Sequence, residues 1–254
     1  MKQLLFEQVS QVAIDLYSGR LKLSDDELAN YRKVVGSPEL VEVSPLTVMM
    51  VGQVNAGKSS LINALFKECV AEADVLPATD GFGRYLLTLE EGLELVLVDS
   101  PGLDGSEVTA KMLLEQAVRT DLLIWVSQAT QQAKSLDKAM ISQWDAYFDI
   151  ELGRKKPPLL LVTTHNDMLP GASEWNPPYD LTNLEDPRVM SMLGALAYTG
   201  KAMGLDESAP GIVIALGKDK TFNIDHLKDV LASISEEARA AQLNRERLDA
   251  ATST

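Results

Sequence analysis

The feature that most constrains this chain is the octapeptide Gly-Gln-Val-Asn-Ala-Gly-Lys-Ser at residues 52–59, which fits the pattern G-x-x-x-x-G-K-[ST]. An apolar run at 46–51 comes before it, and apolar residues at helical spacing follow at 61–66. A strand, a glycine-rich turn and a helix in this order let consecutive backbone N–H groups converge on phosphate oxygens at the positive end of the helix dipole. The octapeptide therefore predicts a site for a nucleoside triphosphate with magnesium.

Each residue type in the octapeptide has an expected contact. Gly52 and Gly57 permit the tight turn, Lys58 is expected to reach the β- and γ-phosphates, and Ser59 to ligate Mg²⁺. The flanking strand and helix favour this interpretation over an ordinary glycine-rich turn. Three further residues complete the expected contacts with the nucleotide at this end: Asn55, Ala56 and Ser60.

Composition limits the other possibilities. With 254 residues, 46% of them hydrophobic, the chain can form one large domain or one domain with helical additions. A net charge of -14 disfavours direct binding to nucleic acid, which requires clustered Lys and Arg. The single Cys69 excludes an internal disulfide framework, and no apolar stretch is long enough to cross a bilayer. We therefore expect a cytoplasmic protein.

Strand-like and helix-like runs alternate along the middle of the chain. The runs at 93–98, 122–126, 159–163 and 212–216 are apolar and bounded by turn residues, which predicts a mostly parallel α/β sheet covered by helices on both faces. The short run at 85–89 leads directly into the next strand, so it predicts one antiparallel edge strand.

The segments outside this alternation suggest additions to a core. Residues 1–45 predict an N-terminal helical hairpin, 46–222 the core domain, and 223–254 a long C-terminal amphipathic helix. Within the core domain, the stretch 170–210 is an insert that contains a predicted helix at 189–203.

A second motif, Asp99-Ser100-Pro101-Gly102, ends the apolar run at 93–98. Asp99 is expected to hold Mg²⁺ through a water molecule, and the N–H of Gly102 to meet the γ-phosphate. Taken alone, D-x-x-G is also typical of a simple turn, but the phosphate loop before it favours the functional interpretation. Asp99 stands 41 residues after Lys58.

With this spacing the chain resembles the Ras-like and Era-like GTPases from about Thr47 to Ala215. The resemblance implies a three-layer P-loop NTPase fold of the Ras-like type and Mg²⁺-dependent hydrolysis of GTP to GDP and phosphate. It also implies that residues 76–81 form the first switch loop, in which Thr79 would bind Mg²⁺ by its hydroxyl and the γ-phosphate by its N–H. A surface turn before a strand is the alternative for this segment.

The peptide Thr-Thr-His-Asn-Asp at 163–167 resembles the guanine motif [NT]-K-x-D of these GTPases. Thr164 would take the first position, His165 replaces the lysine, and Asp167 would accept hydrogen bonds from the guanine N1–H and exocyclic amine, which adenine does not offer. His165 either stacks on the base or is an ordinary exposed loop residue. The last family motif, whose N–H meets the guanine oxygen, would fall at Ala215-Leu216.

The resemblance also bears on catalysis. Leu103 stands where Ras-like proteins carry a water-orienting glutamine, and leucine makes no hydrogen bonds. Asn55 stands where Era-like, TrmE-like and dynamin-like GTPases also have asparagine, which in several of them helps to hold K⁺ against the phosphates. A turn-forming asparagine explains it equally well. We expect a slow GTPase, stimulated by K⁺ or by homodimerisation through the switch loops, in which Lys58, Thr79, Gly102 and Asn55 act.

Other interpretations stay open. The chain is also compatible with a non-hydrolysing GTP-binding scaffold, with the GTPase domain of a dynamin-like protein in peripheral contact with the inner membrane, or with an ATP-using P-loop protein. The helical additions at both ends would connect a molecular switch to a protein partner. A role with RNA in the manner of Era is disfavoured by the acidic charge.

Overall fold

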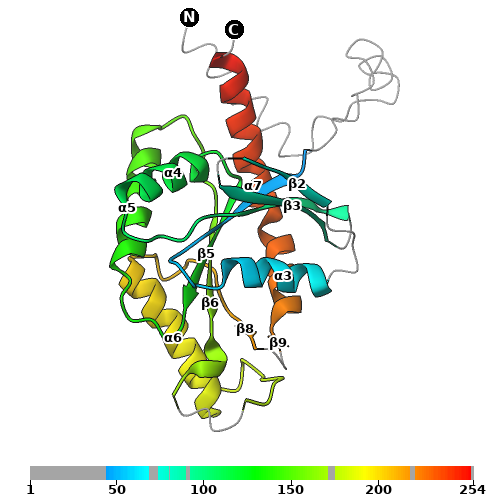
Figure 1. Cartoon of the computed structure of the whole chain (residues 1–254), viewed down its shortest axis with the longest axis vertical. Coiled ribbons are helices and arrows are strands. Elements are labelled where there is room, and N and C mark those ends of the chain that lie inside the picture. Colours follow the sequence, from blue (N-terminus) through cyan, green and yellow to red (C-terminus); the bar gives the residue numbers. More distant parts are fainter. Residues whose placement is uncertain are drawn as a thin grey trace, which may run out of the picture. The chain divides into compact units, whose positions relative to one another are not determined.

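The computed structural model describes residues 44–68, 74–79, 81–89, 92–170, 175–217 and 221–252, with only the backbone at 74–79. Residues 44–254 form one compact unit. The hairpin predicted at 1–45 lies outside the described residues, except for its last two positions. Figure 1 shows the elements of the described unit, whose bounds are β1 (Leu46–Val51), α3 (Lys58–Glu68), β2 (Asp74–Thr79), β3 (Phe82–Thr88), β4 (Glu94–Asp99), α4 (Glu107–Ala117), β5 (Leu122–Gln128), α5 (Ser135–Ile150), β6 (Leu159–Thr164), the 3₁₀ turn η2 (Asn166–Met168), α6 (Pro187–Met203), β7 (Gly211–Val213), β8 (Ala215–Leu216), β9 (Thr221–Phe222) and α7 (Ile224–Thr252).

The central sheet has seven strands in the order β2-β3-β4-β1-β5-β6-β7. β1 pairs in parallel with β4 and β5, and the parallel pairing continues through β6 to β7. β3 is antiparallel to both of its neighbours. The mostly parallel α/β sheet predicted from the alternating pattern is confirmed. The predicted antiparallel strand is present as β3, but it is not the edge strand, because β2 pairs outside it.

Alternate residues of the strands contact helices on opposite faces of the sheet. On one face, Val48 and Met50 of β1 share a core with α3 and α7. On the other, Met49 and Val51 share a core with α4, α5 and the end of α6. Figure 1 shows these helices on the two sides of the sheet. The strands are apolar on both faces because both faces are covered, which accounts for their continuous apolar runs.

The segment predicted as a switch loop at 76–81 differs from its prediction. Its first part lies in β2, which pairs with β3 up to Thr79 opposite Phe82, with an irregularity after Leu76. Pro77 fits there because β2 is an edge strand, where a missing N–H breaks no ladder. Gly81, with φ of +83°, provides the turn into β3.

The single strand predicted at 212–216 is also wrong, because the run divides at Ile214. β7 belongs to the main sheet, whereas β8 pairs with β9 in a separate two-stranded sheet. The Ile214 carbonyl accepts a hydrogen bond from the Asn166 side chain at 2.8 Å instead of joining a strand ladder. The chain therefore leaves the sheet here and places β8 beside the loop that follows β6.

The predicted insert helix is present as α6, slightly longer than expected. The Asp186 carboxylate caps it by accepting the N–H of Arg188 at 2.8 Å, and Pro187 takes the first turn, where no N–H is needed. Gly204 ends the helix in the left-handed conformation, with φ of +79°.

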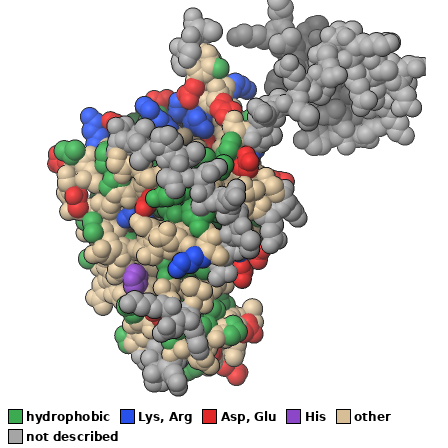
Figure 2. Space-filling view, turned by 45° about the vertical axis from the view of Figure 1, so that its right-hand side comes forward, with side chains coloured by type: hydrophobic (Ala, Val, Ile, Leu, Met, Phe, Trp, Pro, Cys, Tyr) green, Lys and Arg blue, Asp and Glu red, His purple; other side chains and the backbone are tan. Residues whose placement is uncertain are grey.

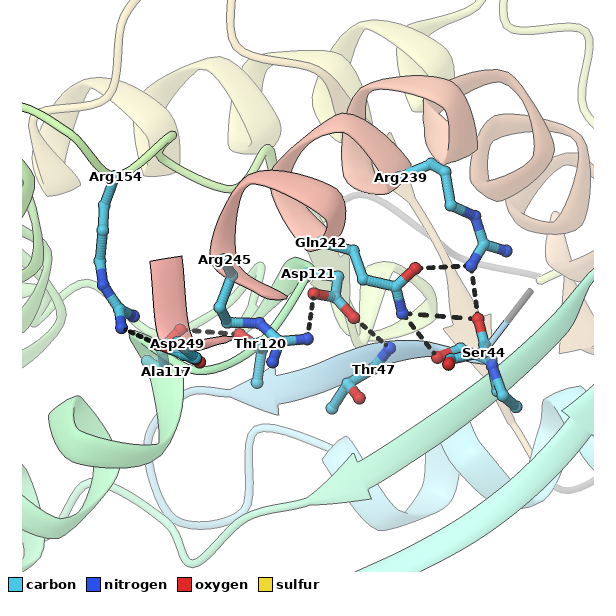
Figure 3. Close-up of polar contacts among 11 residues, drawn as sticks. Ser44, Thr47, Ala117, Thr120, Asp121, Arg154, Arg239, Gln242, Arg245 and Asp249 are labelled. Atoms are coloured by element: carbon cyan, nitrogen blue, oxygen red, sulfur yellow. Dashed lines mark hydrogen bonds and ion pairs between the residues drawn. The ribbon is translucent and has the colours of Figure 1, made fainter. Parts of the chain in front are cut away.

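The C-terminal helix α7 is joined to the start of β1 by polar contacts (Figure 3). Asp121, which is completely buried, accepts the N–H of Thr47 at 2.8 Å and one N–H of Arg245 at 2.9 Å. Gln242 donates to the carbonyl of Pro45 at 3.1 Å, and Arg239 donates to the carbonyl of Ser44. α7 is therefore part of the same compact unit as the sheet.

On one face of the molecule, positively and negatively charged side chains are mixed (Figure 2). On the face shown in Figure 2, Lys and Arg side chains gather toward the end of α7 and are interspersed with Asp and Glu. Two arginines of the chain are paired with carboxylates, Arg154 with Asp249 and Arg245 with Asp121. Within the described ranges, no helix combines the length and apolar character needed to cross a membrane.

Candidate nucleotide-binding site

A cavity of about 590 Å³ opens at the carboxyl ends of the parallel strands, where α/β folds bind their ligands. Its lining comes from four separate segments: the octapeptide, the D-x-x-G motif, the loop after β6, and the turn after β8. The lining residues are Val54, Asn55, Gly57, Lys58, Ser59, Ser60, Ser100, Gly102, His165, Asp167, Met168, Leu216 and Gly217. Folding therefore brings most of the predicted site residues to one cavity.

The octapeptide forms a loop whose shape depends on left-handed backbone. Gly52, Asn55 and Gly57 have φ of +151°, +64° and +96°. A Cβ on Gly52 would lie 2.0 Å from the carbonyl oxygen of Val126 in β5, so any side chain there would displace the loop or the strand. Asparagine tolerates the left-handed region better than most residues, which gives Asn55 a conformational reason to stand in the loop.

Lys58 begins α3 and lies at the inner wall of the cavity, only 7% exposed. Its Nζ donates to the carbonyls of Gly52 at 3.1 Å and Gln53 at 3.0 Å, so the ammonium is held within the loop. Burial lowers the pKa of Lys58 below its ordinary value, an effect that the carboxylates of Asp99 and Asp137 oppose. An anion bound in the loop would be a third partner for this cation.

Ser59 and Asp99 meet at the mouth of the cavity. The Ser59 hydroxyl donates to Asp99 Oδ2 at 2.5 Å, although the two residues belong to different elements, α3 and the end of β4. A hydroxyl and a carboxylate oxygen are ligands that Mg²⁺ prefers. Across the described ranges, no cluster of three or more His, Cys, Asp or Glu residues suits a metal. The Ser59 hydroxyl and the Asp99 carboxylate fit a magnesium ion that also takes oxygens from a bound polyphosphate.

The segment after Asp99 lies against the phosphate loop. Leu103 donates its N–H to the Gly52 carbonyl at 3.0 Å and accepts the N–H of Val54 at 3.3 Å. A Cβ on Gly102 would lie 2.6 Å from the Val54 Cα, so only glycine permits this approach. The Leu103 side chain is 5% exposed and packs in the core, and leucine has no group that could orient water.

The structure gives the backbone position of Thr79 and leaves its side chain undescribed. Thr79 pairs with Phe82, and the next residue of β3, Gly83, pairs with Asp99. The backbone of Thr79 is thus separated from Asp99 by one strand, at the same end of the sheet as the cavity.

The other end of the cavity is formed by the loop after β6. Thr164, completely buried, donates its hydroxyl to the Ala56 carbonyl at 2.7 Å and so connects this loop to the phosphate loop. His165 has φ of +56°, a left-handed conformation in which histidine is enriched, and its Nδ1 lies 2.9 Å from Thr164 Oγ1. Asp167 and His165 both line the cavity and are partly exposed.

The second predicted base-reading segment, Ala215-Leu216, lies beside this loop as β8. Leu216 lines the cavity together with Gly217, whereas the Ala215 side chain is fully buried. The sequence prediction placed this segment after a strand at 212–214, and in the structure it follows β7 and forms the small β8–β9 sheet.

A polar network behind the phosphate loop was not predicted from the sequence. Gln53 donates to Asp137 Oδ2 at 2.6 Å, and Trp125 Nε1 donates to Asp137 Oδ1 at 2.8 Å. Lys134, 3% exposed, donates to Ser127 Oγ at 2.6 Å, and its burial lowers its pKa while Asp137 opposes the shift. No sequence pattern identifies this network, because Gln53 occupies a variable position of the motif and its partners are far away in the chain.

Comparison with known proteins defines the class. Residues 47–164 match the model of the 50S ribosome-binding GTPase family. GTPase Der of Chlamydia trachomatis serovar L2 (strain ATCC VR-902B / DSM 19102 / 434/Bu) is 34% identical over 126 residues, which are 46% of this chain and 24% of Der. Translation initiation factor IF-2 of Thermodesulfovibrio yellowstonii is 27% identical over 141 residues, 52% of this chain and 19% of that protein.

The chain also aligns with solved structures at low sequence identity. The GTP-binding protein of Sulfolobus solfataricus in complex with GDP aligns with a TM-score of 0.45 and 19% identity, over 90% of this chain and 61% of that one. The G domain of the T. maritima FeoB iron transporter aligns with a TM-score of 0.44 and 18% identity, over 76% of this chain and 99% of that one.

The strand order of the sheet and the match over residues 47–164 together indicate a domain with the fold of a Ras-like P-loop GTPase. The matched part of the chain is similar to bacterial GTPases such as Der. The chain spans about a quarter of the length of the Der sequences with which it aligns.

Proposed function

We propose that the chain works as a Mg²⁺-dependent GTPase switch in which one cavity holds the whole nucleotide. The observation that carries this proposal is that one cavity is lined both by Ser59, which is hydrogen-bonded to Asp99, and by Asp167. In this proposal, the N–H groups of residues 52–60 and the Lys58 ammonium hold the phosphates, and Asp167 reads the guanine. His165 stacks on the base, and the N–H groups at Ala215-Leu216 meet the guanine oxygen.

Magnesium is the proposed cofactor. Ser59 supplies the hydroxyl ligand, Asp99 acts through a bound water, and Thr79 completes the ligand set when the triphosphate is present. The bound ion adds positive charge beside the β- and γ-phosphates. Replacing Ser59 with Ala is expected to abolish the magnesium dependence of GDP affinity while leaving affinity without the metal unchanged.

The intrinsic rate of hydrolysis is proposed to be slow. Leu103 is buried and hydrogen-bonded to the phosphate loop through its main chain, so its side chain does not orient the attacking water. The N–H of Gly102 is the proposed contact with the γ-phosphate, and Lys58 and Thr79 stabilise its developing charge. Water must then be oriented by main-chain groups, by a second copy of the chain across the switch segments, or by a partner.

Potassium is the proposed activator. Held by Asn55, it would add positive charge against the phosphates. Asn55 lines the cavity at the loop position where its side chain is exposed. Replacing Na⁺ with K⁺ in a phosphate-release assay should raise the rate in wild type and not in Asn55→Ala. Equal rates in the two salts would leave Asn55 with a conformational role alone, in keeping with its φ of +64°.

The test of the central proposal is a turnover measurement with purified chain, GTP and Mg²⁺, alongside titration of GDP. GDP binding with release of phosphate supports the switch. Bound GTP that persists for hours in both Na⁺ and K⁺ would instead support a non-hydrolysing scaffold, and lack of binding to either GTP or GDP would overturn both. Sizing with GDP and with a non-hydrolysable GTP analogue tests homodimerisation.

The proposed place of work is the cytoplasm. A peripheral contact with the inner membrane would have to be made by surface residues or by a protein partner, and sedimentation with anionic vesicles in each nucleotide state tests for it. Recovery of the chain in the supernatant in both states would exclude the direct contact.

A further inference from the structure

Asn166 has no assigned role in the guanine motif, yet it is 1% exposed and its side chain contacts a distant segment of the chain. Its Nδ2 donates to two carbonyls, those of Thr163 and Ile214, each at 2.8 Å. The Thr163 carbonyl also accepts the N–H of Ile214 at 2.8 Å. One side-chain amide thus connects two segments that lie 48 residues apart in the chain.

These two segments are the ones that face the base. Asn166 directly precedes Asp167, and Ile214 directly precedes the Ala215-Leu216 segment. The Asn166 amide therefore fixes the distance between the carboxylate and the backbone groups that are proposed to read neighbouring atoms of the guanine. A carboxylate in its place would present no donor to either carbonyl.

The insert packs behind this connection. Trp175 and Tyr179 contact Phe222 of β9, with ring centroids 5.8 and 5.6 Å away. Arg188 of α6 donates to the Tyr179 hydroxyl at 2.8 Å, which connects the aromatic rings to the helix. Figure 1 shows α6 at the same end of the molecule as β8 and β9. We call Trp175, Tyr179 and Phe222 the aromatic cluster.

A small cavity of about 130 Å³ lies between the aromatic cluster and the loop, lined by Asn166, Trp175 and Arg188 among others. Asn166 Oδ1 is buried and has no hydrogen-bond partner among the described residues. Only the Nδ2 end of this side chain is engaged, so its fixed orientation depends on the two carbonyls and on the packing of the insert.

We propose that Asn166 is a positioning residue for guanine selectivity, supported from behind by the aromatic cluster of the insert. This inference rests on the proposed function, because it concerns how the same cavity distinguishes guanine from adenine. The motif lysine, whose stem would lie along the base, is replaced by His165. The connection through Asn166 provides an alternative source of rigidity for the two base-facing segments.

The test compares the dissociation constants of GDP and ADP, with Mg²⁺, by competition against a fluorescent GDP analogue. In Asn166→Ala the Kd of GDP should rise about tenfold, as expected for the loss of two hydrogen bonds, while the Kd of ADP changes by less than about twofold. The ratio of the Kd of ADP to the Kd of GDP should therefore fall, and the isosteric Asn166→Asp should show the same fall in this ratio. Asn183→Ala, an exposed asparagine of the same insert, is the matched control and should leave the ratio unchanged.

The ratio separates positioning from a purely structural role. Equal loss of affinity for GDP and ADP, or an unchanged ratio in a variant with an unaltered melting curve, overturns the proposal. If both Asn166 variants fail to fold, Trp175→Phe decides, with an expected fall in the ratio of about threefold from weaker packing on Phe222. Failure of the wild-type chain to bind GDP would overturn the proposed function itself, which is a different result.

Discussion

The two ends of the cavity are built on different principles. The phosphate end consists of one contiguous loop whose shape is set by the left-handed backbone at Gly52, Asn55 and Gly57. The base end is assembled from the loop after β6, the β8–β9 sheet and the insert, joined by the side chains of Thr164 and Asn166. The comparison teaches that the shape of the phosphate end is set by local main-chain geometry, whereas the shape of the base end depends on side-chain contacts between distant segments.

Gly52→Ala should produce the largest effect and tests whether the phosphate end depends on its backbone alone. The new Cβ would lie 2.0 Å from the Val126 carbonyl, so the loop must move and GDP affinity should fall by about a thousandfold. Gly153→Ala is the control, since its Cβ meets nothing within 4 Å. Isothermal titration measures both, and near-normal affinity in Gly52→Ala would show that the loop is adaptable.

Asp167→Ala should have the next largest effect, and this effect should be confined to recognition of the base. Removal of the carboxylate should reduce the preference for GDP over ADP by about a hundredfold while phosphate contacts persist. Competition binding of both nucleotides reports the change. Asp180→Ala, in an exposed turn of the insert, serves as the control, and retention of selectivity in Asp167→Ala would place guanine recognition elsewhere.

His165→Asn should have a smaller effect. Asparagine keeps the left-handed backbone but removes the ring, so GDP affinity should fall about fivefold if the imidazole stacks on the base. His226→Asn, at the start of α7, is the control. An unchanged dissociation rate of GDP would show that His165 is only a loop residue.

The smallest expected effect is a pH dependence that arises at the phosphate end. Because burial lowers the pKa of Lys58, the folded chain binds fewer protons than the unfolded chain between that lowered pKa and 10.5, and stability rises with pH across this window. Without nucleotide, the melting temperature of wild type relative to Lys58→Met should therefore increase by about 2 °C between pH 8 and pH 10. Parallel melting curves would contradict the prediction, and bound GDP with Mg²⁺ should remove the difference.

The features that could be predicted from the sequence are those formed by residues close together in the chain. The strand-loop-helix at 46–68 and the D-x-x-G motif are local patterns, and the apolar runs identified most of the sheet. β2 was predicted as a loop because Pro77 and Gly81 suggest a turn, whereas pairing with β3 outweighs that preference. The division at Ile214 depends on the distant Asn166 side chain, which no local pattern reveals.

The contact between α7 and β1 connects the C-terminal helix, through the strand, to the phosphate loop. The Asp121 carboxylate holds Arg245 with one oxygen and the Thr47 N–H with the other, and β1 runs from there directly into Gly52. Any displacement of the last turns of α7 across the sheet must either separate this buried ion pair or shift the strand that carries the loop.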